Sequence, residues 1–313
     1  MRKAAKAHKE DIKAHLPQIA YADMHCDSVT ACCGEGARLA SFSGQVSGQK
    51  LLSSGCAVQC FAIFTEGKNS AADFEKYTAF YFDEIRRGKF YPVFRAADVL
   101  AARARGKTGA VLTVENLGFL GGDVSGIFRL ATMGVKMASL RWNNPNAFAA
   151  ERLTPSGKDA VVALNQSRMI VDISHLPDGA AEEVLDISLQ PVVASHSDCR
   201  AVCNVARNLP DELIGRIADS GGIVGLNFSR NFLGEGSAVQ NFIAHFWHLL
   251  NVGGEDVLAL GSDFDGIVPY AEIADCTYVP EVFRAVLQSG VPERIVEKFA
   301  LGNFMRVFEQ VVG

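Results

Sequence analysis

The sequence predicts a (β/α)₈, TIM-like barrel, because short apolar runs alternate with helix-length segments along the chain. Eight such runs are present, and most are continuously apolar, as is typical of parallel strands that are covered on both faces. A doubly wound parallel sheet is the structural alternative. The predicted strands are residues 19–25, 55–64, 109–115, 135–142, 168–175, 191–196, 221–228 and 256–264.

Helical patterns separate most of these strands. They lie at residues 74–88, 157–166, 178–188, 209–220 and 238–251. No Pro/Gly/Ser-rich linker or change in composition divides the chain, so residues 1–313 are predicted to form a single catalytic barrel domain. Residues 1–18 are basic but have no apolar h-region, so we expect an N-terminal surface helix rather than a signal peptide.

Composition excludes several classes of function. The net charge of -5 and the lack of a basic run argue against a nucleic-acid surface, and no apolar run approaches the ~18 residues of a membrane span. The eight cysteines lie in hydrophobic segments without a CxxC pair, so we expect most to be reduced and buried. Thiolate ligation by Cys56/Cys60 or Cys199/Cys203 is the alternative. The prediction is a cytoplasmic protein that binds neither nucleic acid nor membrane.

The first strand places three potential metal ligands at every second position. The stretch ADMHCDS at residues 22–28 contains Asp23, His25 and Asp27. Alternate residues of a strand share one face, so these side chains would project from the same side of the backbone. This spacing is typical of a metal site.

Further polar residues end the other predicted strands. In a barrel of this class, the active site is built at the C-terminal ends of the strands. Three of the seven histidines fall there, whereas His8 and His15 lie in the basic N-terminal segment, and His245 and His248 are interpreted as helix surface or packing residues. The polar residues at strand ends are His25, Asp27, Glu115, Asp172, His175, His196, Asp263 and Asp265.

Convergence of these side chains predicts a metal centre. Unpaired charges gathered at one barrel mouth are costly unless a cation compensates them. Imidazole and carboxylate ligands without thiolate suit Zn²⁺, Mn²⁺ or Fe²⁺. Five ligands exceed the need of one tetrahedral zinc, so we predict two ions, with His25 and Asp27 on one, His175 and His196 on the other, and Glu115 as the bridge.

Two carboxylates follow the last predicted strand. Asp263 lies at the strand's end and is the candidate proton shuttle of the metal centre. Asp265 lies two residues further on and is interpreted as a loop or helix-cap carboxylate.

Six motifs, in order, resemble the successive signatures of the renal (membrane) dipeptidase family, a branch of the metal-dependent amidohydrolase superfamily. The resemblance extends from about residue 20 to LGNFMRVFE at residues 301–309. The first motif contains HxD, where many relatives in the superfamily have HxH, which favours the dipeptidase branch over deaminases. The motifs are MHCD, TVEN, LTPSGKDAVVALNQSRMIVDISH, PVVASHSDCRAVCNVARNLPDE, GGIVGLNF and ALGSDFDG.

This resemblance implies a TIM-like barrel with a binuclear zinc centre that hydrolyses dipeptides, including some with a D-residue at the C-terminal position. By motif position it implies that Arg207 receives the substrate and that Asp263 is the catalytic aspartate. It implies the same five metal ligands, His25, Asp27, Glu115, His175 and His196. The expected partners are a small dipeptide substrate and, in a homodimer, a second copy of the chain.

One position departs from the family's pattern. The family commonly has a histidine after the fourth strand, in a pattern resembling LTHNxxNxLA, that contacts the substrate carbonyl. This chain has SLRWNNPNAFA, which places Trp142 there. An indole N–H can donate one hydrogen bond but cannot titrate near neutrality. An aromatic wall of the pocket is therefore favoured for Trp142 over a donor role.

Two other functions fit the same residues. The centre could hydrolyse another small amide or ester, such as an N-acyl amino acid or a lactone. The protein could also be a catalytically silent metal-binding barrel with an interaction role, although all five ligand positions and Asp263 are present.

Overall fold

Eight parallel strands follow one another around the sheet in the order β1-β2-β4-β5-β6-β7-β8-β9. The computed structural model describes residues 19–68 and 70–313, so the helix predicted over residues 1–18 lies outside the described part. Each predicted strand segment contains one strand of this path. These are β1 (Tyr21–Asp23), β2 (Cys56–Phe64), β4 (Gly109–Glu115), β5 (Val135–Ser139), β6 (Ile170–Asp172), β7 (Val192–Ala194), β8 (Ile223–Leu226) and β9 (Leu258–Leu260). A short additional strand, β3 (Tyr91–Pro92), pairs with β4 off the path.

Backbone hydrogen bonds join the last strand to the first. Met24 N donates to Leu260 O at 2.9 Å, and Asp27 N donates to Phe264 O at 2.8 Å. At the same seam the Ser262 hydroxyl donates to Asp23 Oδ2 at 2.6 Å. A doubly wound sheet would have two free edges instead, so the barrel prediction is confirmed.

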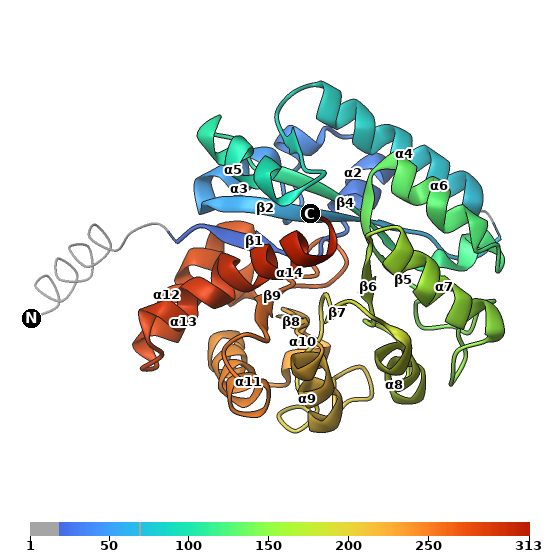
Figure 1. Ribbon diagram of the computed structural model, residues 1–313. Helices are drawn as coiled ribbons and strands as arrows, with labels where there is room; N and C mark the ends of the chain where they lie inside the picture. Colours follow the sequence, from blue (N-terminus) through green and yellow to red (C-terminus); the bar gives the residue numbers. More distant parts are fainter. Residues whose placement is uncertain (1–18, 69) are drawn as a thin grey trace, which may run out of the picture.

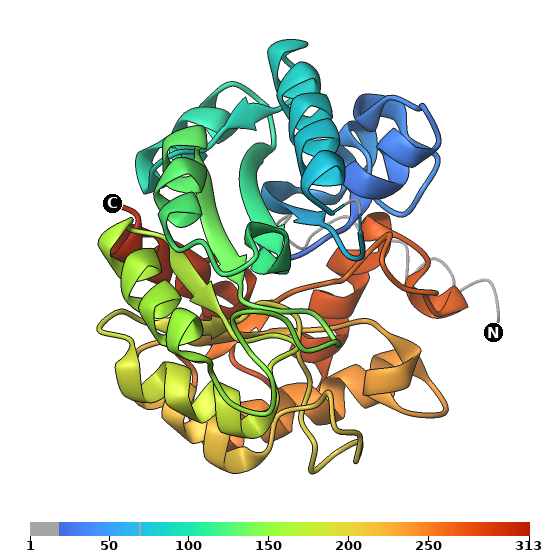
Figure 2. The ribbon, with the colours of Figure 1, turned by 90° about the vertical axis from the view of Figure 1, so that its right-hand side faces the viewer.

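Helices surround the strands on the outside of the barrel (Figures 1 and 2). The five predicted helical segments correspond to α4 (Ser70–Arg86), α7 (Pro155–Gln166), α8 (Asp178–Ile187), α9 (Asp211–Asp219) and α11 (Ala238–Gly253). Local capping explains where some begin, since the Thr154 side chain accepts a hydrogen bond from Gly157 N and Pro155 occupies the first turn of α7. The helices are α2 (Ser28–Gly34), α3 (Gly48–Ser54), α4 (Ser70–Arg86), α5 (Ala96–Ala104), α6 (Ser125–Met133), α7 (Pro155–Gln166), α8 (Asp178–Ile187), α9 (Asp211–Asp219), α10 (Arg230–Leu233), α11 (Ala238–Gly253), α12 (Val279–Gln288), α13 (Glu293–Glu297) and α14 (Asn303–Val311).

Two buried clusters occupy the two faces of the sheet. The larger packs the outward side chains of the strands against the surrounding helices. The smaller joins inward side chains such as Val111, Met137 and Ile170 to Phe304 and Phe308 of α14. Alternation along β4 continues the inward face from Val111 towards the polar strand end. The barrel interior is therefore apolar beside α14 and polar at the opposite end, where the strands finish.

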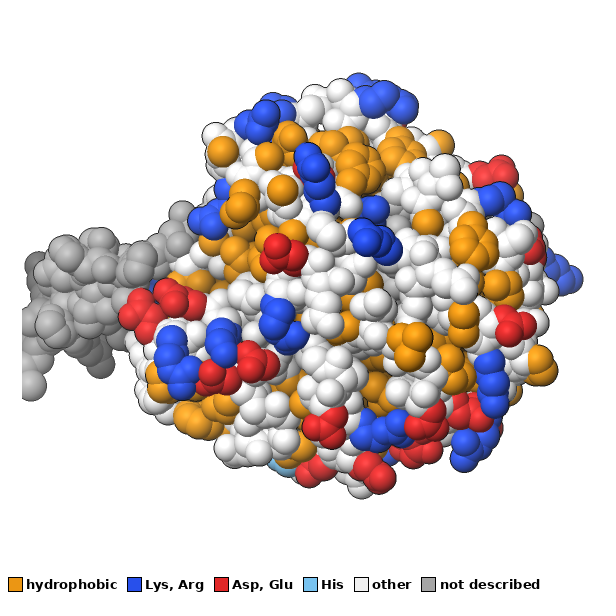
Figure 3. All heavy atoms as spheres, in the orientation of Figure 1, with side chains coloured by type: hydrophobic (Ala, Val, Ile, Leu, Met, Phe, Trp, Pro, Cys, Tyr) orange, Lys and Arg blue, Asp and Glu red, His pale blue; other side chains and the backbone are white. Residues whose placement is uncertain are grey.

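The state of the cysteines and the distribution of surface charge agree with what the sequence predicts. All eight cysteines are free thiols and six of them are buried, as predicted. Neither Cys56/Cys60 nor Cys199/Cys203 belongs to a cluster that could hold a metal among the described residues. On the face shown in Figure 3, acidic and basic side chains are interspersed. Within residues 19–68 and 70–313, no helix is both long and apolar enough to cross a membrane.

Candidate metal centre

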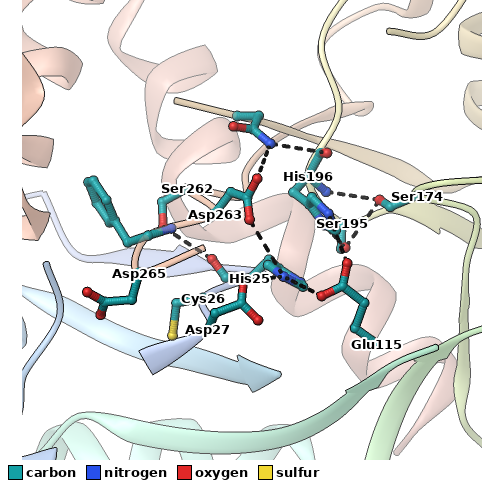
Figure 4. Close-up of polar contacts among 12 residues, drawn as sticks. His25, Cys26, Asp27, Glu115, Ser174, Ser195, His196, Ser262, Asp263 and Asp265 are labelled. Carbon is teal, nitrogen blue, oxygen red and sulfur yellow. Dashed lines mark hydrogen bonds and ion pairs between the residues drawn. The ribbon is translucent and has the colours of Figure 1, made fainter. Parts of the chain in front are cut away.

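The five predicted ligands come together at the C-terminal ends of four strands. His25 and Asp27 follow β1, and Glu115 is the last residue of β4. His175 follows β6 and His196 follows β7. Four of these side chains are buried and His175 is partly buried. Figure 4 shows His25 with Asp27, Glu115 and Asp263 around it, and His196 beside them.

Glu115 lies between His25 on one side and the pair His175 and His196 on the other, and it turns a different carboxylate oxygen to each side. Its Oε2 atom is 3.5 Å from His25 Nε2. Its Oε1 atom is 2.8 Å from His175 Nε2 and 3.7 Å from His196 Nε2. A carboxylate with one oxygen toward each group has the orientation that a bridging ligand needs.

The Nε2 atoms of His175 and His196 are only 2.9 Å apart. Each ring places its other nitrogen against a partner, since His175 Nδ1 lies 2.9 Å from Asn143 Oδ1 and His196 Nδ1 lies 2.7 Å from Ser195 Oγ. Burial lowers the pKa of His175 to about 4 and that of His196 well below its ordinary value, so both rings are neutral at pH 7. With the proton of each ring on Nδ1, two lone pairs face each other, and this arrangement needs a cation.

A second group of donors surrounds His25. Its Nε2 atom is 3.6 Å from Asp27 Oδ2 and 3.9 Å from Asp263 Oδ1. His25 Nε2 and Asp27 Oδ1 are buried and have no hydrogen-bond partner. Burial alone would lower the pKa of His25, but the Glu115 and Asp27 carboxylates outweigh it and raise this pKa well above its usual value. The surroundings of His25 therefore favour positive charge.

The donor atoms fit a metal ion in two overlapping groups. His25, Glu115 and His196 form one, and His25, Asp27 and Asp263 form the other, with the donor atoms of each group within 4.8 Å of one another. Imidazole nitrogens and carboxylate oxygens are the ordinary ligands of catalytic zinc. The orphaned buried atoms and the facing lone pairs are what a metal ion would satisfy.

Strained backbone holds several residues at this end of the barrel. His175 has a φ of 68°, Asp263 of 62° and Asn116 of 75°. A side chain other than glycine seldom adopts this left-handed region, which costs about 1–3 kcal/mol and concentrates at functional sites. All three residues lie just beyond the end of a strand, and the side chains of His175 and Asp263 line the site.

Asp263 is held by an amide at the edge of the centre. Its Oδ2 atom accepts a hydrogen bond from Asn227 Nδ2 at 2.9 Å, which leaves Oδ1 facing His25. Burial raises the pKa of Asp263 to about 7, with His25 opposing the shift and the nearby Asp27 and Glu115 adding to it. A carboxyl group with this pKa can both accept and release a proton near neutral pH.

A cleft of about 810 Å³ opens above these residues and is lined by Asp27, Glu115, His175 and Asp263 among others. Arg207 also lines it, with Nη1 donating to Ser197 Oγ at 2.7 Å and Nη2 donating to His196 O at 2.9 Å. The Nε atom of Arg207 is buried and has no partner. The guanidinium group therefore has unused donors at the cleft.

Trp142 forms one wall of the same cleft. Its ring centroid lies 5.1 Å from that of Phe64 and 5.9 Å from that of His175. Both Trp142 and Phe64 line the cleft. These contacts support the aromatic-wall interpretation.

The remaining candidates serve packing and structure. His245 is buried, where Nδ1 accepts a hydrogen bond from Cys199 N at 3.0 Å and Nε2 lies 3.2 Å from Leu233 O, which agrees with a packing role. His248 is a partly exposed helix residue, as predicted, and its Nε2 atom lies 2.7 Å from Asp211 Oδ1 of another helix.

Two carboxylates near the site stabilise the local structure. Asp265 accepts hydrogen bonds from Ser28 Oγ at 2.5 Å and from Gln45 N at 2.6 Å, as expected of a loop carboxylate. Asp23, the first residue of the alternating run, joins β1 to the last strand through Ser262 and is not in either donor group.

Comparison with known proteins identifies the family. A model of the membrane dipeptidase family, peptidase family M19, matches residues 9–312. The chain belongs to the membrane dipeptidase family. The activity of this family is metal-dependent dipeptide hydrolysis, and the chain is thus a metallopeptidase of the dipeptidase class.

Relatives and solved structures of the membrane dipeptidase family agree. A dipeptidase of Claviceps purpurea (tcpJ) is 33% identical over 241 residues, which are 73% of this chain but only 57% of that protein. A protein of Klebsiella pneumoniae is 30% identical over 243 residues, covering 72% of this chain and 90% of that protein. The crystal structure of the M19 metallopeptidase dipeptidase AC is 25% identical with a TM-score of 0.90, covering 95% of this chain and all of the other.

Three residues that the sequence did not single out hold the predicted functional side chains in place. Asn143, Ser195 and Asn227 each contact a predicted functional side chain. Ser195 lies in the motif PVVASH, directly before His196. Asn227 lies in the motif GGIVGLNF, on the predicted strand before the one that ends near Asp263. Their position in those motifs was the available signal.

Proposed function

We propose that the protein hydrolyses dipeptides at a centre of two zinc ions, with Mn²⁺ or Fe²⁺ as alternative metals. His25 and Asp27 would hold one ion, His175 and His196 the other, and Glu115 would bridge them. The observation that carries this proposal is the pair of neutral imidazoles whose Nε2 atoms lie 2.9 Å apart beside a carboxylate. When bound, the zinc ions supply Lewis acidity that acidifies water and polarises a carbonyl.

The protein's own groups would carry the proton and the substrate. Asp263, kept in place by Asn227, would accept a proton from the attacking water and donate it to the leaving amine. The unused N–H groups on Nη1 and Nη2 of Arg207, which lines the cleft, would bind the carboxylate of the C-terminal residue. Trp142 and Phe64 line the cleft and would limit the access of water there.

A comparison of substrates tests this proposal. A metallopeptidase from Rhodobacter sphaeroides, 23% identical with a TM-score of 0.85, was solved with a phosphinate mimic of L-Ala-D-Ala. We expect zinc-loaded protein to cleave L-Ala-L-Ala or L-Ala-D-Ala and to lose this activity on chelation. Hydrolysis of an N-acyl amino acid or a lactone without cleavage of any dipeptide would favour the other amidohydrolase function. Zinc binding without hydrolysis of any of them would favour the silent barrel.

Cytoplasmic location and a homodimer are further proposals. Eight free thiols, most of them buried, suit a reducing compartment. Exposed apolar side chains such as Phe94, Leu100 and Phe128 would be partly covered if they lay in an interface between two copies. Light scattering of the purified chain tests the dimer, and fractionation of the source cells tests the location.

A further inference from the structure

We propose that Asp172 and Ser195 fix the ring proton of His196 on Nδ1 and thereby keep Nε2 free to bind metal. Asp172 contacts no atom of the centre itself, so it is a positioning residue. The inference rests on the metal centre proposed above. It concerns the chain's own groups, and it can be tested without metal or turnover.

Asp172 is the last residue of β6, is buried and accepts three hydrogen bonds. Its Oδ1 atom accepts from Ser174 N and from Ser195 N, each at 2.9 Å. Its Oδ2 atom accepts from Ser195 Oγ at 2.5 Å. The carboxylate therefore uses both oxygens as acceptors, and the short contact to Oδ2 takes the single hydroxyl proton of Ser195.

This assignment determines the tautomer of His196. Ser195 Oγ lies 2.7 Å from His196 Nδ1. Because the hydroxyl proton already points to Asp172, Ser195 can only accept in this second contact, and His196 Nδ1 must carry the ring proton. Figure 4 shows Ser195 beside His196 and Ser174. The remaining lone pair, on Nε2, faces the centre.

The backbone around Ser195 leaves this chain of hydrogen bonds little freedom. A Cβ atom at Gly225 would lie 2.1 Å from the Ser195 carbonyl oxygen, and one at Gly261 would lie 1.7 Å from it. Glycine at both positions lets β8 and β9 approach the peptide unit of Ser195 closely. Ser195 is fully buried. The backbone of Ser195 is therefore held by packing, and its hydroxyl is held by Asp172.

His175 offers an internal contrast. Its Nδ1 atom contacts the amide oxygen of Asn143, an exposed loop residue, rather than a hydroxyl tied to a carboxylate. If the Asn143 side-chain amide flips by 180°, it presents its NH₂ group as a donor in place of the oxygen acceptor. It therefore does not impose one tautomer on His175. We infer that the protein enforces the metal-binding tautomer at His196 and permits it at His175.

An isosteric substitution tests the direction of the hydrogen bonds. In Asp172→Asn the amide oxygen must remain on the two backbone N–H groups, which places Nδ2 against Ser195. The asparagine then donates to Ser195, Ser195 donates to His196 Nδ1, and the ring proton moves to Nε2, toward the metal. Loss of such an outer partner typically lowers metal affinity about 10–100-fold, and we expect a loss in this range in a zinc-chelator competition.

Two serine variants provide the matched comparison. Ser195→Ala removes the link and should also weaken zinc binding. Ser174→Ala removes a buried hydroxyl of the same layer, which lies 3.3 Å from Ser195 Oγ and accepts a hydrogen bond from His196 N at 3.2 Å. It leaves the side-chain contacts between Asp172, Ser195 and His196 in place. It should retain zinc affinity close to that of the wild type. If Asp172 had only a structural role, its substitution would lower thermal stability, and Ser195→Ala and Ser174→Ala would not differ in zinc affinity.

The tautomer itself is measured in zinc-free protein. Nitrogen-15 shifts of the His196 ring, assigned against a His196→Asn variant, should show the proton on Nδ1 in the wild type and on Nε2 in Asp172→Asn. A wild-type ring protonated on Nε2, or unchanged zinc affinity in both Asp172→Asn and Ser195→Ala, would overturn the inference. If Asp172→Asn does not fold, the wild-type spectrum and Ser195→Ala still decide it. Zinc-loaded wild type that cleaves no dipeptide would overturn the proposed function alone.

Discussion

The donors left unused by Arg207 predict a specific coupling between this side chain and the carboxylate of a dipeptide. Two of the five N–H bonds of the guanidinium group are engaged, by Ser197 and by the His196 carbonyl, and the buried Nε has no partner. A charge-assisted hydrogen bond contributes roughly 1.5–3 kcal/mol. At ~1.4 kcal/mol per tenfold, capping the dipeptide as its amide should lower kcat/KM about 10–200-fold.

The test is a cycle of two changes measured by steady-state kinetics. Arg207→Met should lower kcat/KM for the free dipeptide by a similar factor, yet change little for the dipeptide amide. Two changes that remove the same contact cannot each count in full, so the combined loss should fall well short of the product of the single losses. Arg207→Lys should recover little, because an ammonium group lacks the planar fork.

Two controls separate this effect from damage to the site. Metal content must be measured in each variant, because Arg207 also holds the backbone of His196. Arg230→Met is the matched variant, since Arg230 lines the same cleft but is largely exposed and pairs with Glu235 at 2.9 Å. It should retain the discrimination between dipeptide and amide. If wild type cleaves both substrates equally, or if the two losses simply multiply, Arg207 does not bind the carboxylate.

Three further predictions follow from single positions. Asp263→Asn should retain its metal but lose about 10²–10⁴-fold in kcat, because an amide cannot transfer the proton. Gly261→Ala should lower stability to urea by about 1–3 kcal/mol through overlap with the Ser195 carbonyl, whereas Gly215→Ala, which meets nothing within 4 Å, should not. Burial lowers the pKa of His245 from 6.5 to about 4, so the unfolded chain binds this proton first and stability should fall as the pH drops from about 6.5 to about 4. The loss is about 3 kcal/mol at 1.36 kcal/mol per pH unit, and His245→Gln should flatten that part of the profile in urea unfolding.

Each of these has a contradicting result. Near-normal kcat in metal-replete Asp263→Asn would remove this residue from the mechanism. Equal urea midpoints for Gly261→Ala and wild type would show that the strands separate easily there. An unchanged pH profile in His245→Gln would assign the acid sensitivity to other groups.

The sequence predicts the positions of the site residues well, because the rule that places them is simple. Parallel strands finish at one end of a barrel, so residues such as Glu115 and His196 that follow apolar runs must lie near one another. The structure brings them to 3.7 Å. The strand β3 was not predicted, because two residues are too few to show a period.

The contacts that assign roles depend on distant residues and on backbone detail. Asp23 resembles a ligand in the sequence, but its partner Ser262 is 239 residues away. Asp172 and His175 end the same predicted strand, yet Asp172 points to the Ser195 hydroxyl, whereas a left-handed φ of 68° at His175 accompanies a ring directed at Glu115. Neither outcome follows from the period of a strand.

The number of metal ions bound by the chain tests the central claim most directly. Zinc-reconstituted protein, freed of excess metal, is analysed for zinc per polypeptide beside Glu115→Gln. We expect close to two zinc ions in the wild type and a loss of both in the variant, because the Glu115 carboxylate turns one oxygen to His25 and the other to His175. One ion or fewer in the wild type, or two retained without the Glu115 carboxylate, would contradict the binuclear centre.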